Sequence, residues 1–297
     1  KRHGVYVHDA ASGLIEENEI FRNCSSGVQI ATAADPTVCA NQIHRGSGAG
    51  IHVTDGGLGL LDNNTVFLND GPGLEITTLG RPRAVHNTFH SGHSFGVHAH
   101  DCGMGVIGAE GDKASAGNDV YGNTGAGVLV QTGANPIFDG NTIHDGKTVG
   151  IEVSQQGLGK FNENDVFKNQ VAQVKVLSGG NPMFTKNLIH SSADIDSKGI
   201  SVTDDGSTGT FLDNEVSDIG GSCGIEILTF GHPTFTRNKV HKCEKAGVHC
   251  HSEGAGFLDN NQFFDNPAVS VLVSTAATPE FVGNSIRDSG YGVCVED

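Results

Sequence analysis

The chain has 297 residues, of which 43 are Gly and none is Trp, and its formal net charge at pH 7 is -16. Gly is about twice as frequent as in average proteins, and the long helix-forming stretches of ordinary globular domains are missing, so the composition argues against two such domains. The negative charge disfavours a protein that reads a nucleic-acid backbone or binds an anionic membrane surface.

A unit of 23 residues repeats along the chain. Residues 27–72 hold two such units, and each opens with Gly and an apolar-x-apolar strand and closes on Asn-x-apolar. Aligned on that Asn, the chain contains twelve units, and the spacing departs from 23 only before the fifth, ninth and tenth. The column consists of Asn18, Asn41, Asn64, Asn87, Asn118, Asn141, Asn164, Asn187, Asn214, Asn238, Asn261 and Asn284. A fixed period of this kind predicts a repeat architecture.

Odd and even units differ at two fixed positions. Six of the eight Pro residues lie five positions before the Asn of the even units, where most odd units have Gly. Three positions after the Asn, a column of rings reads Phe21, His44, Phe67, His90, Tyr121, His144, Phe167, His190, Ser217, His241, Phe264 and Arg287, with Ser217 and Arg287 as exceptions. Because this column alternates with a buried apolar one, we expect it to face outward or lie at a corner, where the rings either stack on one another or dock a peptide or sugar face.

The unit is too short for a helical crossover between parallel strands, and no helical period is visible. Gly, Asn and Pro at fixed places mark corners. A parallel β-solenoid, in which each unit makes one coil, buries the alternating apolar residues of every unit. Each Asn then hydrogen-bonds the Asn of the next coil, so we interpret the Asn column as structural. The sequence predicts an all-β parallel solenoid of about twelve coils.

Two insertions interrupt the period, one of eight residues within 106–117 and a shorter one within 191–198. Insertions leave a solenoid as loops and often border a working face. No linker or low-complexity stretch divides the chain, so we predict one domain over residues 1–297. Because both chain ends fall inside the repeat, we expect this domain to be a segment of a longer protein.

The units GVxVxxxxxGxxxxNxIxxN and GVxIxTxxxPxxxxNxIHxG resemble the right-handed parallel β-helix repeats of the pectate-lyase-like superfamily. Their alternation of a Gly unit with a Pro unit ending in Ile-His is similar to the β-helix region of the F-box protein that serves as a substrate receptor of a cullin-RING ubiquitin ligase. The resemblance covers essentially the whole chain. It implies a right-handed parallel β-helix with an elongated surface that recognises a protein. No F-box is visible in this chain, so a ligase role is not carried by the chain itself.

Strand residues between the apolar pair are expected to point outward and to align from coil to coil. Counted from the opening Gly, the first such column reads Tyr6, Gln29, His52, Glu75, His98, Leu129, Glu152, Lys175, Ser201, Glu226, His249 and Leu272. Its notable cluster is His52, Glu75 and His98 on three consecutive coils, with His100 two residues further on and Asp101 beside it. We expect Glu75 to lie about 5 Å from His52 and from His98 along the backbone.

A carboxylate between imidazoles has three interpretations: an acid/base pair or metal site, a set of contacts for a bound ligand, or a solvated row of oppositely charged cross-strand partners. We favour the solvated row, because Glu152–Lys175 and Glu226–His249 look like the same pairing device. The residues Asp9, Asp55, Asp101 and Asp204 are interpreted as turn formers rather than calcium ligands.

The known chemistries of β-helix enzymes are not visible in the outward columns. Pectate lyases and uronan epimerases need acidic groups for Ca²⁺ or the uronate and a basic residue that takes the proton, whereas these columns hold no Arg, no Asp and a single Lys. Clustered Asp at glycosidase spacing is missing too. We therefore assign no catalytic residue, no metal ligand and no cofactor. If the chain were an enzyme, its residues would be His52, Glu75, His98 and His100.

The function predicted from the sequence is non-catalytic recognition of a protein or peptide partner, with His52, Glu75, His98, His100 and Asp101 and the insertion loops as the binding surface. The alternative is a carbohydrate-active or carbohydrate-binding β-helix with a polysaccharide partner, similar to a lyase, hydrolase or epimerase. The third hypothesis is that the chain is a purely architectural rod or spacer. Neither a nucleic-acid nor a membrane partner is expected.

The seven Cys residues show no spacing typical of a zinc site. Cys250 and Cys294 replace an apolar strand residue, so we interpret them as small buried hydrophobes. Because an odd number of scattered Cys suits a reducing compartment, we expect an intracellular location, cytoplasmic or nuclear.

Overall fold

The computed structural model describes residues 2–109, 117–191 and 196–297, and every regular element among them is a β-strand. The chain divides into two compact units, Lys1–Lys147 and Thr148–Asp297. Within each unit, three strands make one coil, and each strand pairs in parallel with the strand three places further along the chain. The predicted all-β parallel solenoid is confirmed, whereas the single domain over 1–297 stays a prediction.

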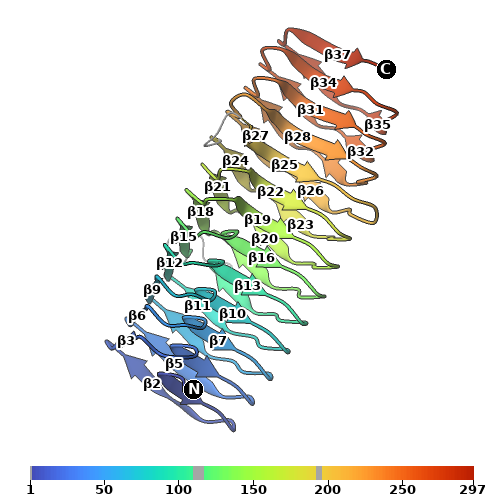
Figure 1. Ribbon diagram of the computed structural model, residues 1–297. Coiled ribbons are helices and arrows are strands. Elements are labelled where there is room, and N and C mark those ends of the chain that lie inside the picture. The colour runs from blue at the N-terminus through green and yellow to red at the C-terminus, as the bar shows by residue number, and fades with distance from the viewer. Residues whose placement is uncertain (1, 110–116, 192–195) are drawn as a thin grey trace. The chain divides into compact units, whose positions relative to one another are not determined.

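In the unit Lys1–Lys147 the coils place their strands in three sheets, and neighbouring strands such as β7, β10 and β13 lie side by side in Figure 1. The first sheet contains β1 (Val5–Val7), β4 (Val28–Ile30), β7 (Ile51–Val53), β10 (Leu74–Ile76), β13 (Val97–Ala99) and β16 (Val128–Val130). The second contains β2 (Ser12–Glu16), β5 (Asp35–Cys39), β8 (Leu60–Asp62), β11 (Arg83–Val85), β14 (Val106–Gly108) and β17 (Ile137–Asp139). The third contains β3 (Glu19–Phe21), β6 (Gln42–His44), β9 (Thr65–Phe67), β12 (Thr88–His90), β15 (Asp119–Tyr121) and β18 (Thr142–His144).

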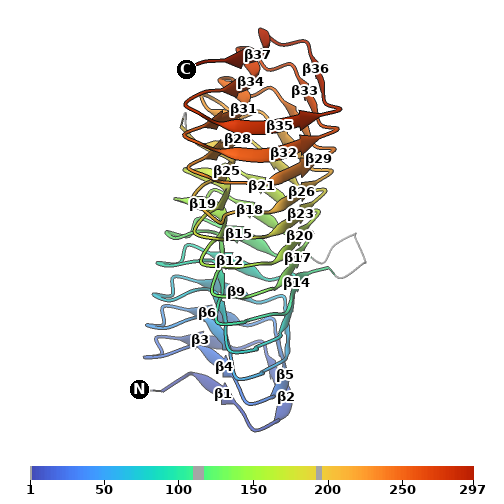
Figure 2. The same cartoon turned by 90° about the vertical axis from the view of Figure 1, so that its right-hand side faces the viewer.

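The unit Thr148–Asp297 has the same three sheets, and Figure 2 shows the strands of its first sheet from β25 to β37 stacked in chain order. The first sheet contains β19 (Val149–Val153), β22 (Ala172–Val176), β25 (Lys198–Val202), β28 (Cys223–Leu228), β31 (Ala246–His251), β34 (Val269–Val273) and β37 (Tyr291–Val295). The second contains β20 (Lys160–Asn162), β23 (Met183–Thr185), β26 (Thr210–Leu212), β29 (Thr234–Thr236), β32 (Ala255–Asp259) and β35 (Thr278–Val282). The third contains β21 (Asp165–Phe167), β24 (Leu188–His190), β27 (Glu215–Ser217), β30 (Lys239–His241), β33 (Gln262–Phe264) and β36 (Ser285–Arg287).

The core of each unit follows from the period-2 alternation of its short strands. Ile51 and Val53 of β7 are fully buried, and His52 between them faces the other side of the sheet. In the second sheet of the unit Thr148–Asp297, buried rings stack from coil to coil at centroid separations of 4.4 to 5.1 Å. These rings are Phe161, Phe184, Phe211 and Phe235. Parallel strands in register place residues at equivalent repeat positions directly above one another, so each coil packs on the next in the same way.

The predicted Asn column forms a continuous hydrogen-bond ladder within each unit. The Oδ1 atom of Asn87 accepts hydrogen bonds from both the backbone N and the Nδ2 of Asn64, at 3.0 and 2.9 Å. The Nδ2 of Asn87 in turn donates to the Oδ1 of Asn118. In the other unit, Asn214 and Asn238 repeat this contact. The ladder satisfies corner N–H groups that would otherwise be buried without a partner, so the structural interpretation of the column is confirmed.

Corners of the coil use residues that tolerate close approach or a left-handed backbone. A Cβ atom on Gly50, directly before β7, would clash with Cγ1 of Val66 and lie 2.8 Å from the backbone O of Gly73, so only Gly fits there. The turns after the first-sheet strands have positive φ at Asp55 (49°) and Asp101 (48°). Asp adopts this conformation more readily than most residues, which supports their interpretation as turn formers.

Some sequence expectations are corrected or lie outside the described residues. Cys250 is fully buried as expected, but Cys294 is only half-buried, because it lies on β37, the last strand of its sheet. Residues 110–116 and 192–195, which hold most of the two predicted insertion loops, are not among the described residues. In the part of the chain that the structure describes, no helix is long and apolar enough to cross a membrane.

Candidate functional site

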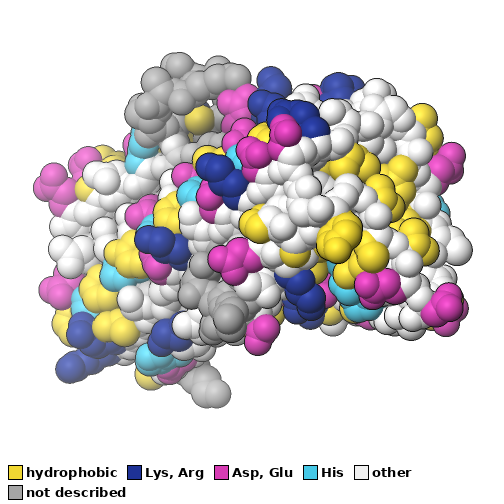
Figure 3. Space-filling view, turned by 90° about the horizontal axis from the view of Figure 1, so that it is seen from above, with side chains coloured by type: hydrophobic (Ala, Val, Ile, Leu, Met, Phe, Trp, Pro, Cys, Tyr) yellow, Lys and Arg dark blue, Asp and Glu magenta, His cyan; other side chains and the backbone are white. Residues whose placement is uncertain are grey.

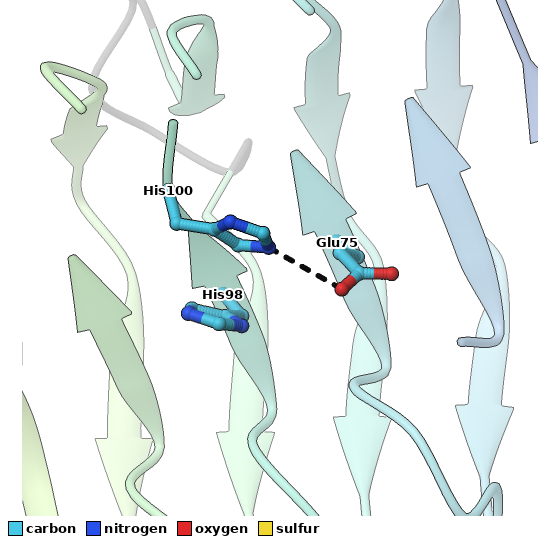
Figure 4. Close-up of side chains that lie close together, drawn as sticks. All are labelled: Glu75, His98 and His100. Atoms are coloured by element: carbon cyan, nitrogen blue, oxygen red, sulfur yellow. Dashed lines mark hydrogen bonds and ion pairs between the residues drawn. The ribbon is translucent and has the colours of Figure 1, made fainter. Parts of the chain in front are cut away.

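The cluster predicted from the sequence lies on one face of the first sheet of the unit Lys1–Lys147. Glu75, at the centre of β10, is in register with His52 of β7 and with His98 of β13. His100 follows the end of β13 and lies on the same side as His98, because strand side chains alternate with a period of two. Figure 4 shows both imidazoles on one strand and the Glu75 carboxylate on its neighbour.

The side chains of this cluster are in close contact. Nε2 of His100 lies 3.4 Å from Oε1 of Glu75, and Nε2 of His52 lies 3.9 Å from the other carboxylate oxygen. The rings of His98 and His100 are 4.2 Å apart between centroids. Nδ1 of His100 lies 2.9 Å from the carboxylate of Asp101. The structure therefore brings all five predicted site residues together around one carboxylate.

The cluster is half-buried, whereas the sequence favoured a solvated row. The side chains of His52, Glu75 and His100 are 20 to 25% exposed, and His98 as a residue is 9% exposed. One cause is Phe95, whose ring lies 4.9 Å from the ring of His98. The interpretation as solvated charge pairs is thus corrected: these groups are partly withdrawn from water, and only Asp101 is well exposed.

Partial burial sets the charge state of each group. Burial lowers the pKa of His98 to about 4, assisted by repulsion from His100, and burial also lowers the pKa of His52. The hydrogen bond with Glu75 raises the pKa of His100 against the effect of burial. Burial alone would raise the pKa of Glu75, but the hydrogen bond from His100 and the attraction of the imidazoles lower it overall. Near neutral pH the cluster therefore contains a carboxylate and two neutral imidazoles, His52 and His98.

Two ring nitrogens in this cluster have no hydrogen-bond partner. Nε2 of His52 and Nε2 of His98 are both buried atoms without one. Among the described residues, only Glu75, His98 and His100 bring three potential metal-ligand atoms within 4.8 Å of one another. The arrangement offers neutral imidazole and carboxylate donors, which are the donor types that zinc and related ions prefer.

The unit Thr148–Asp297 contains the same three side chains on equivalent strands. Glu226 of β28 is in register with His249 of β31, and His251 follows two residues later. The rings of His249 and His251 are 4.3 Å apart, and Nε2 of His251 lies 3.5 Å from Oε1 of Glu226. From the sequence, only the Glu226–His249 pair was expected here. The signal for the full set was the motif Gly-apolar-Glu followed one coil later by Gly-Val-His-x-His, which occurs in both units.

The partners of this second set are different. Nζ of Lys198 lies 3.8 Å from Oε2 of Glu226, and the hydroxyl of Ser201 donates to the same oxygen at 3.3 Å. Nε2 of His249 is 3.1 Å from the hydroxyl of Ser274. Here the carboxylate is neutralised by an ammonium group, and the imidazole nitrogen has a partner. The two units thus share one scaffold but present different chemistry.

Next to Glu226 lies a cavity of about 200 Å³ that the sequence analysis missed. It crosses strands β22, β25 and β28, because Lys175, Ser201 and Glu226 are in register on them. Its lining consists of Val171, Ala172, Lys175, Lys198, Ser201, Thr203, Glu226 and Leu228. Lys198 lies at the end of the shorter insertion, so it belongs neither to the outward column listed above nor to the positions two residues further on. Counting along those positions therefore found a single Lys on this face.

The column of His and aromatic rings stacks on itself. Phe67 lies between His44 and His90 at centroid distances of 4.6 and 5.3 Å, with interplanar angles of 18° and 10°. The unit Thr148–Asp297 shows the same stacking of His241 on Phe264 at 4.6 Å. Figure 3 shows His side chains alternating with hydrophobic ones along one row of the face in view. Because neighbouring rings cover each other's faces, the column offers edges rather than flat faces to a ligand, which favours the self-stacking alternative.

Comparison with known proteins identifies the family of this fold. The model of the family described as right handed beta helix region matches residues 1–115, 98–189 and 127–286. The chain therefore belongs to the right-handed β-helix family, as its repeats predicted. No curated protein matches the sequence.

Several solved structures are similar to this chain. An alanine mutant of the periplasmic alginate epimerase AlgG has a TM-score of 0.52 at 11% identity, over 95% of this chain and 78% of that chain. The periplasmic alginate epimerase AlgG itself has a TM-score of 0.49 at 12% identity with the same coverage. The A-module of the Azotobacter vinelandii mannuronan C-5 epimerase AlgE4 has a TM-score of 0.45 at 13% identity, over 97% and 83%. At such identities the likeness is one of fold alone.

Proposed function

We propose that this chain is a saccharide-binding β-helix and that the cavity lined by Lys175, Lys198, Ser201, Thr203 and Glu226 holds one acidic sugar ring of its ligand. The observation that carries the proposal is the combination of size and lining in that cavity. Pockets for drug-sized ligands have volumes of roughly 300 to 1,000 Å³. A cavity of about 200 Å³ is smaller, and it suits a single ring of an oligosaccharide that continues along the sheet.

The lining matches the two faces of a sugar. The hydroxyls of Ser201 and Thr203 and the carboxylate of Glu226 offer donors and acceptors to ring hydroxyls, while Val171 and Leu228 offer apolar contact to ring C–H groups. The hydroxyl of Ser201 already bonds Glu226, so the polar groups are oriented before a ligand arrives. Oriented groups lose less conformational freedom on binding.

The charges of the lining select an acidic sugar. The cavity is lined by two Lys and one Glu, in a chain whose formal net charge is -16. Glu226 offsets one ammonium, at 3.8 Å from Lys198, so the lining by itself has one net positive charge, on Lys175, which is in register with Glu152 of β19 outside the lining. A uronate carboxylate would receive charge-assisted hydrogen bonds there.

Binding rather than catalysis is proposed, in line with the non-catalytic reading of the sequence. The β-helices that this chain resembles in fold include an alginate epimerase, and that resemblance supports a saccharide as ligand class without assigning an activity. The protein or peptide partner predicted from the F-box-type resemblance rests on that resemblance alone, and we rank it second.

The test is calorimetric titration of the intact chain with oligosaccharides, in one uronic and one neutral series. We expect binding of the uronic series, weakened by added salt, and a loss of about tenfold or more in affinity in Lys198→Ala, since hydrogen bonds to charged groups contribute about 1.5–3 kcal/mol. Lys186→Ala is the matched control, because Lys186 makes an exposed ion pair of the same 3.8 Å length with Glu163 outside the cavity lining. Equal weakening by both variants, or no binding of any uronic saccharide, would contradict the proposal.

A further inference from the structure

We propose that Glu75, His98 and His100 form a binding site for a divalent transition-metal ion of the zinc type. The site lies in the unit Lys1–Lys147, whereas the saccharide cavity lies in the other unit, so the two proposals stand on different residues and fail independently. The sequence alone assigned no metal ligand, because the register predicts which residues are neighbours but not whether their ligand atoms converge.

Distances and donor types fit such an ion. Three ligand atoms, one from each residue, lie within 4.8 Å of one another. In a tetrahedral zinc site with bonds of about 2.0–2.1 Å, ligand atoms are about 3.3–3.4 Å apart. The distance from Nε2 of His100 to Oε1 of Glu75 is already 3.4 Å, so this edge of the tetrahedron needs no rearrangement. Two imidazoles and one carboxylate leave a fourth position for water or another ligand, as in catalytic and open zinc sites.

Two buried imidazole nitrogens without a hydrogen-bond partner support the metal site independently of the distances. Nε2 of His98 is a buried atom with no hydrogen-bond partner, on a residue that is 9% exposed. A buried polar atom without a partner costs about 1–3 kcal/mol, and coordination to a metal would satisfy it. Nε2 of His52 is also unpartnered and faces the other oxygen of Glu75 at 3.9 Å. Burial lowers the pKa of His98 to about 4, so its imidazole is neutral at pH 7 and a nitrogen lone pair is free for a metal.

Asp101 completes the arrangement from the outside. Its carboxylate lies 2.9 Å from Nδ1 of His100. A carboxylate that accepts the Nδ1–H bond of a metal-binding His fixes the ring and directs Nε2 to the metal. Asp101 is held in turn, because its backbone N donates to the hydroxyl of Thr132 at 2.8 Å. Asp101, which lies in a left-handed turn, therefore acts on the site through His100 and is a positioning residue.

The equivalent residues of the other unit provide a built-in comparison. Glu226, His249 and His251 use the same strands and spacing, but their ligand atoms do not converge within the same distance in the described structure. Lys198 holds the Glu226 carboxylate, and Ser274 satisfies the ring nitrogen of His249. The residue beside His251 is Ser252, a hydroxyl where the first unit has the Asp101 carboxylate. We therefore assign metal binding to the first set and none to the second.

The test titrates the metal-free full chain with Zn²⁺ by calorimetry and with Co²⁺ by visible absorption, which reports tetrahedral coordination. We expect one ion per chain, with Glu75→Gln and His98→Gln each abolishing stoichiometric binding. Glu226→Gln is the matched control and should leave stoichiometry and affinity unchanged. Asp101→Asn should keep the site but weaken it by about 10–100-fold, as is typical for the carboxylate partner of a metal-binding His. Circular dichroism of each variant establishes that it is folded.

Three results would overturn the proposal. The first is the absence of stoichiometric Zn²⁺ or Co²⁺ binding by the wild-type chain. The second is binding that survives in folded Glu75→Gln, which would place the ion on exposed surface pairs such as His93 and Asp70. The third is an equal loss in Glu75→Gln and Glu226→Gln, which would mean that the two sets do not differ as assigned. If His98→Gln fails to fold, His100→Gln takes its place with the same expectation.

Discussion

Nε2 of His100 and Oε1 of Glu75 lie 3.4 Å apart, although 25 positions separate the two residues in the sequence. The contact exists because each coil adds one strand to the same sheet in exact register. Its counterpart in the other unit, His251 to Glu226, measures 3.5 Å. The surroundings then decide the chemistry: unpartnered imidazole nitrogens in the first case, and an ammonium group and a hydroxyl in the second.

The buried neutral His98 makes stability depend on pH. Its pKa is about 4 in the folded chain against 6.5 for the free side chain, so the unfolded chain binds more protons between these values. Its contribution to stability is therefore complete above about pH 6.5 and is lost as the pH falls toward about 4. We expect the fall in unfolding free energy between pH 7.5 and pH 5, measured by urea denaturation in chelator, to be up to about 2 kcal/mol smaller in His98→Gln than in wild type.

The pKa of His100 is shifted in the opposite direction to that of His98, so His100→Gln serves as the control for this experiment. Its pKa is raised by the hydrogen bond with Glu75, so its contribution to stability is present at low pH and is lost as the pH rises through its folded pKa. His100→Gln should therefore steepen the loss of stability on acidification. If both variants change the pH dependence in the same direction, the assigned charge states are wrong.

Loss of one rung of the Asn ladder should be strongly destabilising. Asn87 is 1% exposed and is hydrogen-bonded to Asn64 on one side and Asn118 on the other. Asn87→Ala leaves several buried polar groups without partners, at about 1–3 kcal/mol for each such group. We expect a loss of about 3 kcal/mol or more in chemical denaturation. Asn18→Ala, at an exposed rung, should cost about 1 kcal/mol; equal costs would refute the burial argument.

The stacked ring column should matter for stability and not for ligand binding. Phe67→Ala removes the ring between His44 and His90 and with it two stacking contacts, each of about 0.5–1.5 kcal/mol. We expect a loss of about 2 kcal/mol in unfolding free energy, with Phe67→Tyr close to wild type. A stable Phe67→Ala variant that no longer binds saccharide would show instead that the column is a docking surface.

Thiol reactivity should follow burial. Burial raises the pKa of Cys223 to about 11 and of Cys250 to about 12, and Cys243 is likewise buried with a pKa of about 12. Since the thiolate is the reactive form, these three should not react with a thiol reagent in the native state. The exposed Cys24 and Cys102 should react within the first phase of a timed assay. Rapid labelling of Cys243 in the folded chain would contradict the packing of that corner.

The fold could be predicted from the sequence because a single 23-residue period determines it. The column that contains Asn64 and Asn87 sets the length of a coil, and coil length sets the register, so the pairing of Glu75 with its neighbours could be predicted. Each prediction needed only the spacing of residues along the chain. The ladder and the parallel sheets follow from that spacing alone.

The chemistry of the sites could not be predicted in the same way. The burial of His98 depends on Phe95, which lies in the loop before β13 at a position where the preceding coils have Ser26, Ala49 and Pro72. The cavity depends on Lys198, which lies beside Glu226 at the end of an insertion that shifts the period. Such contacts depend on side-chain packing across coils, so the sequence indicated which residues surround Glu75 but not that they are half-buried.

The central claim is that the cavity beside Glu226 holds an acidic sugar ring. The most direct measurement is a crystal structure of the chain with a bound uronic oligosaccharide. We expect one sugar ring in this cavity, with its carboxylate on Lys198 or Lys175 and its hydroxyls on Ser201 and Glu226. A saccharide bound elsewhere on the chain while this cavity holds only water would contradict it.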